Sequence, residues 1–293
     1  MNESSTSQAA MRTDLASELD LSDREGILEL HEQVSGIDIS TIKIVSEGAE
    51  KRLGKPRGEY ITIDVGKVWL ASDEQLEKTA EAVAGKLMSL AEKMCGKRPR
   101  RVLVAGLGNR RITADALGSE TVDLLTVTRH LREHQELFEL FGGTELSAVA
   151  PGVLGETGIE AALLVKGAAE AAQPELIIAI DSLAARSTER LATTVQLGTS
   201  GISPGSGTGG RRIPINADTA GAPVLAFGIP TIVDSATLVL DALEAAGVDH
   251  VSDTLRGVLS NGRDFFVTPK ETDMMVRELS RLSARAIGLA FAH

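Results

Sequence analysis

Residues 102–115 read VLVAGLGNRRITAD, and they decide the fold prediction. The apolar run from Val102 to Ala105 is typical of a strand covered on both faces, as in a parallel sheet. A glycine-containing turn follows and delivers Asp115 to the first turn of a predicted helix near 113–120. Because ligands bind beyond the carboxyl ends of the strands in open parallel sheets, this turn is a candidate site. A dinucleotide-binding fingerprint needs glycine where the chain has Arg111, so we exclude that function.

The rest of the chain extends the same pattern. Apolar runs at 176–180 and 224–227 predict two further buried strands, and helical patterns near 155–172 and 233–246 lie between or after them. Alternating residues at 41–45 and 60–65 predict a small antiparallel sheet. We therefore expect a three-layer α/β/α fold with a mostly parallel central sheet and a small antiparallel appendage.

Two long helices are predicted from their first residues. Ser72 and Gln75 form a capping-box pattern ahead of apolar residues at spacings of three and four. The stretch Thr268-Pro269-Lys270-Glu271 shows the same pattern with proline at the first helical position, and predicts that the last helix begins there.

Composition and charge exclude several classes of protein. The 293 residues carry a net charge of −11, and an acidic surface disfavours direct binding to nucleic acid. The amino terminus has no apolar stretch of the kind found in signal peptides, and no run approaches the ~18 apolar residues of a membrane span. The single cysteine, Cys95, excludes an internal disulfide framework and fits a reducing compartment. We expect a cytoplasmic protein without a membrane partner.

A second acidic residue, Asp181, directly follows the apolar run 176–180. Considered alone, Asp115 is more simply explained as an acid in a first helical turn, favoured by the helix dipole, and Asp181 as a cap for a following helix. If their strands are neighbours, however, the two carboxylates share one end of the sheet. Like charges that close cannot both ionise readily, so one pKa rises and the pair supplies an acid and a base. Such a pair can activate water and protonate a leaving amine.

Another motif offers a different chemistry. His130, Glu133 and His134 match the H-x-x-E-H pattern of inverted zinc peptidases. On an α-helix both histidines would share one face with the glutamate beside them as a base, although a third protein ligand is not located. The alternative is a solvated polar segment. A serine hydrolase has little support, because no Gly-x-Ser-x-Gly elbow follows a strand with acid and histidine partners.

Eight stretches, in one order over most of the chain, resemble the germination protease family of spore-forming bacteria. They are Arg12 to Ala16, GLGNRRITADALG (106–118), VTRHL (127–131), SAVAPGVLGETGIE (147–160), IIAIDSLAARSTER (177–190), GISPGSGTGGRR (201–212), GAPVLAFGIPTIVDS (221–235) and FFVTPKETD (265–273).

The resemblance implies an endopeptidase that degrades small acid-soluble spore proteins in the forespore or spore core, without a cofactor or metal. Its two essential aspartates fall on Asp115 and Asp181. The resemblance further implies a homotetramer made as a self-processing zymogen. Residues 1–14 would be a flexible propeptide and residues 15–293 a single peptidase domain, with self-cleavage between Asp14 and Leu15.

The fold is expected to be similar to that of hydrogenase-maturation endopeptidases, which hold nickel with two acids and a histidine. The next histidine after Asp181 is His250, which matches no motif, so we do not transfer that metal site. A third hypothesis is a binder of spore proteins without catalysis. The processing sequence at Asp14 counts against it, since a binder does not need a self-substrate.

Overall fold

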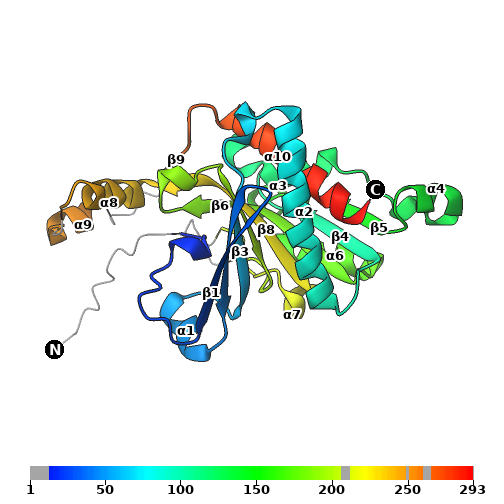
Figure 1. The fold of residues 1–293 in the computed structure, drawn as a ribbon, viewed down its shortest axis with the longest axis horizontal. Helices are drawn as coiled ribbons and strands as arrows, with labels where there is room; N and C mark the ends of the chain where they lie inside the picture. Colours follow the sequence, from blue (N-terminus) through cyan, green and yellow to red (C-terminus); the bar gives the residue numbers. More distant parts are fainter. Residues whose placement is uncertain (1–12, 206–211, 249–250, 260–264, 293) are drawn as a thin grey trace.

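The structure is a computed structural model that describes residues 13–205, 212–248, 251–259 and 265–292 (Figure 1). Most of the predicted propeptide, residues 1–12, therefore lies outside the described residues, as does part of the glycine-rich segment at 206–211. None of the described helices combines the length and the apolar character that crossing a membrane requires.

In the described chain, nine strands form one mixed sheet in the order β1-β2-β3-β7-β8-β6-β4-β5, with β9 paired to β8. The pairs among β5, β4, β6 and β8 are parallel, and the others are antiparallel. The strands are β1 Ile27–Val34, β2 Ile37–Ile44, β3 Gly58–Asp64, β4 Arg101–Gly106, β5 Glu145–Val149, β6 Leu176–Ala185, β7 Thr194–Gly198, β8 Val224–Asp234 and β9 Phe266–Val267.

This topology confirms a mixed α/β fold but corrects the predicted antiparallel appendage. The antiparallel strands are not a separate sheet, because β3 pairs with β7 and thereby continues the parallel part. Strand β1 was not predicted. It forms a hairpin with β2 through Ser35 and Gly36, which have φ of 53° and 82°, as a tight two-residue turn requires.

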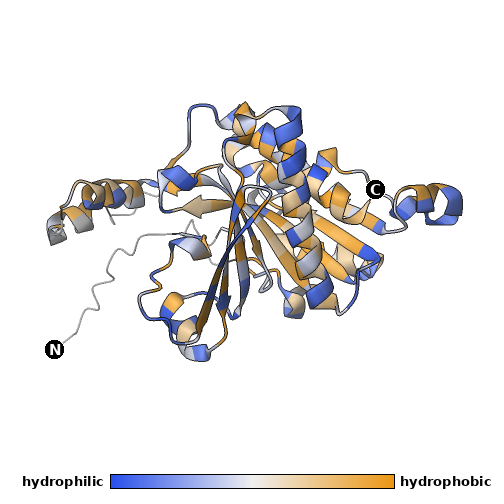
Figure 2. Ribbon diagram, viewed as in Figure 1, coloured by the Kyte–Doolittle hydropathy of each residue, from blue (hydrophilic) through white to orange (hydrophobic). Residues whose placement is uncertain are grey.

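Helices cover both faces of the sheet (Figure 1). On one face α2 and α10 pack against Val104, Ile178 and Phe227, while α6 and α7 pack on the other against Leu103 and Ile177. Figure 2 shows the central strands as the most hydrophobic part of the fold. The helices are α1 Glu47–Leu53, α2 Asp73–Cys95, α3 Leu117–Leu124, α4 Gln135–Leu140, α5 Leu154–Thr157, α6 Ala161–Ala172, α7 Ala217–Ala220, α8 Ser235–Ala245, α9 Asp253–Leu259 and α10 Thr272–Phe291.

The structure confirms one of the two predicted helix starts. Helix α2 begins after Ser72, whose side chain accepts a hydrogen bond from the Gln75 amide, while the Gln75 side-chain oxygen accepts one from the Ser72 amide. The capping box predicted at Thr268 is wrong, because α10 begins at Thr272 without a side-chain cap. The preceding residues Phe266 and Val267 pair with β8, so the chain cannot enter the helix until it has left that strand.

Candidate functional site

Asp115 ends a 3-10 helix, Thr113–Asp115, that follows β4 and its turn. The turn folds back tightly on Asp115 because residue 108 is a glycine with φ of 100°. A Cβ atom at Gly108 would lie 2.0 Å from the carbonyl oxygen of Asp115 and 2.9 Å from its Oδ1, so no other residue fits. The Asn109 amide donates a hydrogen bond to Asp115 Oδ2 at 2.7 Å, which fixes the carboxylate.

Helix α3 holds this turn against the sheet through a second glycine. A Cβ atom at Gly118 would lie 2.4 Å from the Leu107 carbonyl oxygen and 2.7 Å from that of Ile180, the residue before Asp181. The Thr231 hydroxyl of β8 also donates to the Ala114 carbonyl oxygen at 2.6 Å. These contacts bring the element that carries Asp115 against the strands on either side of Asp181.

Asp181 lies within β6, not after it as the sequence predicted. Strand β6 continues to Ala185 because β8 extends with it and keeps pairing beyond residue 181. Strand β4 ends earlier, at Gly106, which pairs with Ile180. From Asp181 onward, β6 is therefore no longer paired with β4. The alternative interpretation, a cap for a following helix, is wrong, since the chain remains a strand there. Asp181 is 6% exposed, and its Oδ1 accepts a hydrogen bond from the Ser182 amide at 3.0 Å.

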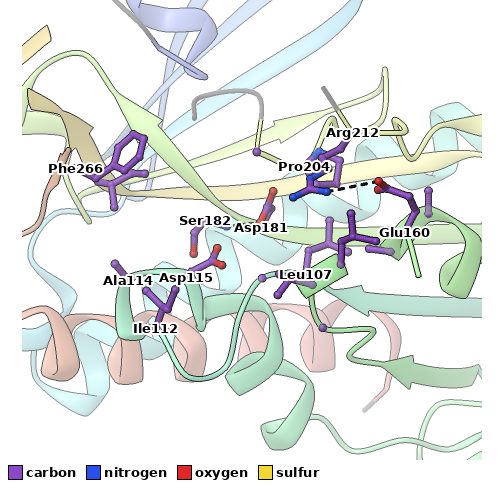
Figure 3. Close-up of a pocket in the computed structure, with 18 of the residues that line it drawn as sticks. Leu107, Ile112, Ala114, Asp115, Glu160, Asp181, Ser182, Pro204, Arg212 and Phe266 are labelled. Carbon is purple, nitrogen blue, oxygen red and sulfur yellow. Dashed lines mark hydrogen bonds and ion pairs between the residues drawn. The ribbon is translucent and has the colours of Figure 1, made fainter. Parts of the chain in front are cut away.

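Asp115 and Asp181 line one cavity of ≈ 440 Å³, and Figure 3 shows their carboxylates on facing elements, directed toward the same space. The remaining wall is largely apolar and includes Leu107, Ile112 and Phe266. The Ser182 hydroxyl oxygen is buried beside the pair and has no hydrogen-bond partner in the described part of the chain. The cavity is therefore a largely apolar cleft that the carboxyl groups of both aspartates face.

Burial and mutual repulsion raise the pKa values of the two carboxyl groups to different extents. Burial raises the pKa of Asp181 well above its ordinary value, and the charges of Asp115 and Asp14 raise it further, against the opposing hydrogen bond from Ser182. Burial also raises the pKa of Asp115, which the Asn109 hydrogen bond opposes and the nearby Glu156 supports. Asp115 thus ionises first, and its charge then keeps the proton on Asp181. Such a pair can supply one base and one acid.

The predicted zinc motif does not form the arrangement that a zinc site requires. His130 and Glu133 lie in a 3-10 helix, Arg129–Glu133, and His134 follows it, so the one-face geometry of an α-helix is lost. All three side chains are exposed. Within the described ranges, no group of three His, Cys, Asp or Glu side chains could hold a metal ion.

Several residues that shape the site were not predicted from the sequence. Glu156 lies near Asp115 and forms an ion pair with Arg111 at 3.5 Å. Arg212 and Glu160 line the far side of the cavity and pair at 3.6 Å (Figure 3). Glu160 and Arg212 are far apart in the sequence, and no local pattern indicates that they meet at the cavity.

Comparison with known proteins places the chain among peptidases. Residues 5–257 match the profile of a family described as germination protease. The germination protease of Caldanaerobacter subterraneus subsp. tengcongensis is 39% identical over 96% of this chain and 94% of its own length. Those of Clostridium acetobutylicum and Bacillus subtilis are 36% and 38% identical, over 88% and 83% of this chain and 86% and 68% of their own. The chain belongs to the germination protease family.

Among solved structures, a [NiFe] hydrogenase maturation protease, HycI from Thermococcus kodakarensis, aligns with 68% of this chain and 98% of its own. The sequence identity is 14% and the TM-score is 0.36.

Proposed function

We propose that this protein is an endopeptidase that hydrolyses small acid-soluble spore proteins during germination. Family membership and the names of the relatives support the substrate class. The observation that carries the chemistry is the meeting of Asp115 and Asp181 at one cavity. These two residues are distant along the chain, and separate elements bring them together.

In the proposed mechanism, the two aspartates divide the proton transfers of hydrolysis. The Asp115 carboxylate takes a proton from a water molecule as the water oxygen attacks the carbonyl carbon of the peptide bond. The carboxylic acid of Asp181 gives its proton to the leaving nitrogen as the carbon–nitrogen bond breaks. The products are a new carboxyl group and a new amine, and one proton returned from Asp115 to Asp181 restores the site.

We infer a self-processing zymogen that cleaves the Asp14–Leu15 bond and then acts as a homotetramer in the forespore or spore core. The net charge of −11 supports a protein that binds its spore-protein substrates and not the DNA.

A peptide assay tests the activity and separates it from the alternatives. A peptide that contains Thr-Glu-Ile-Ala should be cut after the glutamate, as fragment masses will show, and the rate should not change on addition of a chelator. Replacement of His134 by alanine should also leave the rate unchanged. Loss of activity in chelator with recovery in zinc would favour the metallopeptidase. Binding of the peptide with no fragments at any pH would favour a binder without catalysis.

The pH profile of cleavage should follow the two carboxyl groups. Activity requires ionised Asp115, so it should rise with pH through the raised pKa of that residue. It should fall again at higher pH as Asp181 loses its proton, well above the ordinary carboxyl range. Because Glu156 raises the pKa of Asp115, Glu156→Gln should shift the rising limb to lower pH and leave the falling limb in place. An unshifted rising limb would contradict the assignment of Asp115 as the base.

A further inference from the structure

Asp14, the residue before the proposed processing bond, is bound to the domain through both its backbone and its side chain. Its amide donates to the Ala184 carbonyl oxygen at 2.8 Å, and its Oδ2 accepts from the Ala184 amide at 2.9 Å. Asp14, the last residue of the predicted propeptide, is therefore hydrogen-bonded to the domain. The contact uses the edge of β6 that β4 leaves unpaired.

Two side chains converge on the carbonyl oxygen of Asp14. Lys55 Nζ donates to this oxygen at 2.6 Å, and Gln196 Nε2 donates to it at 2.9 Å. Gln196 also accepts a hydrogen bond from the Ala16 amide at 2.6 Å, so it holds the peptide on both sides of the Asp14–Leu15 bond. Two polar donors on one carbonyl oxygen favour hydrolysis of that peptide bond, because they stabilise the negative charge that develops on the oxygen in the transition state.

The strand register places this carbonyl near the row of the sheet that contains Asp181. Gly228 of β8 pairs with Asp181 on one side and with Gln196 on the other. The alternation along β6 and β7 directs both side chains to the same face, opposite the core residues Ile180 and Val195. Two strand spacings separate their backbones by about 10 Å, and the residue between them, Gly228, has no side chain. The Asp14 carbonyl, bound to Gln196, therefore lies on the face that carries Asp181.

Electrostatics agree with this placement. The charge of Asp14 contributes to the raised pKa of Asp181, so the Asp14 carboxylate lies within electrostatic range of Asp181. Burial lowers the pKa of Lys55, while the Asp14 carboxylate raises it. The Lys55 ammonium also lies 5.3 Å from the centre of the Tyr60 ring, which favours a cation. Asp14 and Tyr60 both favour the charged form of this partly buried lysine.

The residues after the bond are held as firmly as Asp14. Leu15 is 0% exposed and packs with Leu183, Leu191 and Val233. Glu18 accepts hydrogen bonds from the Arg186 and Ser187 amides at 2.7 and 2.9 Å. The processing segment is thus fixed on both sides of the Asp14–Leu15 bond.

We propose that Lys55 and Gln196 bind the carbonyl oxygen of Asp14 as the scissile carbonyl and stabilise its negative charge during self-cleavage. This inference rests on the proposed function. Water adds to the Asp14 carbonyl carbon, with its proton passing to Asp115, and the charge on the oxygen faces the Lys55 ammonium and the Gln196 amide. The bond to the Leu15 nitrogen then breaks, Asp181 protonates that nitrogen, and the chain is left with an Asp14 carboxyl group and a Leu15 amine.

The test measures the rate at which the Leu15 amino terminus appears, by mass, in the full chain. Removal of one such donor costs on the order of 100-fold in rate, so we expect about this loss for Lys55→Met and at least a tenfold loss for Gln196→Leu. Lys55→Arg keeps the positive charge and should recover part of the rate. Lys51→Met is the matched control, since Lys51 is an exposed lysine of α1 that pairs with Glu47 at 2.6 Å, and it should process at the wild-type rate.

A second measurement does not depend on activity. In the Asp115→Asn background, hydrogen exchange at the Asp14 and Ala16 amides should be at least tenfold faster with Lys55→Met or Gln196→Leu than with Lys51→Met. Exchange in β4 should stay unchanged and so report an intact fold. Processing by folded Lys55→Met and Gln196→Leu at the control rate would overturn the inference, as would unchanged exchange at Asp14 and Ala16. Processing by Asp115→Asn itself would instead refute the proposed aspartate mechanism, and the exchange data would still judge the binding of Asp14.

Discussion

Asp181→Asn is expected to reduce cleavage of a Thr-Glu-Ile-Ala peptide by about 1,000-fold, because asparagine cannot donate a proton to the leaving amine. Asp115→Asn should cause a loss of the same order, since the amide cannot accept the proton of the attacking water. Initial rates of peptide cleavage, measured at the pH optimum of the wild-type protein, give both values. Asp123→Asn is a suitable control, because this aspartate is exposed and pairs with Arg110 at 2.6 Å away from the cavity wall.

Although Asp181→Asn should lower the cleavage rate, it should not lower the stability of the folded protein at neutral pH. The pKa of Asp181 is higher in the folded chain than in the unfolded chain. Its contribution to the free energy of unfolding is therefore greatest at low pH and is lost as pH rises from the unfolded pKa to the folded pKa. At neutral pH, Asp181→Asn removes this loss, and its melting temperature should equal or exceed that of the wild type. An inactive variant that melts at a lower temperature would indicate lost folding and not lost chemistry, and full activity in both variants would end the mechanism.

The sequence predicts the central part of this fold well, because the residue pattern of each segment there favours the same structure that the packed sheet requires. The apolar runs 102–105 and 176–180 contain no polar residue, and each is short and bounded by a charged residue or glycine, as is typical of strands covered on both faces. The predicted helix after Ser72 has a cap, a repeating apolar stripe and a stop at Gly96, and each of these is a local property. The predicted meeting of Asp115 and Asp181 in one cleft followed from the rule that ligands bind at the carboxyl ends of parallel strands.

What escaped prediction depends on partners that are distant along the chain. Strand β6 extends past Asp181 because β8 extends with it, and the polar residues Asp181 and Ser182 give no sign of this. The anchoring of Asp14 depends on Lys55, on Gln196 and on the Ala184 backbone, which three separate strands and loops bring together. Thr13 to Glu18 look like a polar tail by composition, yet Asp14, Ala16 and Glu18 form hydrogen bonds to the domain. Such contacts follow from topology, which residue patterns constrain only coarsely.

The second large effect is expected at Gly118, where α3 contacts the two strands that position the aspartates. An alanine Cβ would lie 2.4 Å from the Leu107 carbonyl oxygen and 2.5 Å from its nitrogen, far inside contact distance. These are backbone atoms, so relief requires that α3 move away from β4 and β6. We expect Gly118→Ala to lower the free energy of unfolding by about 3 kcal/mol, and the melting temperature by roughly 6–12 °C.

Gly85→Ala in α2 is the matched control for this prediction. A Cβ atom at Gly85 would meet no atom within 4 Å, and the helix should gain about 0.5–1 kcal/mol from the same glycine-to-alanine change. Because both substitutions change backbone entropy alike, the difference in their thermal melts isolates the close contact at residue 118. Movement of α3 also displaces Asp115 from Asp181, so the remaining folded Gly118→Ala protein should cleave peptide on the order of 100-fold more slowly. Equal melting temperatures for the two variants would contradict the close contact at residue 118, and cleavage at the wild-type rate by Gly118→Ala would show that the approach of α3 to the sheet does not set the position of Asp115.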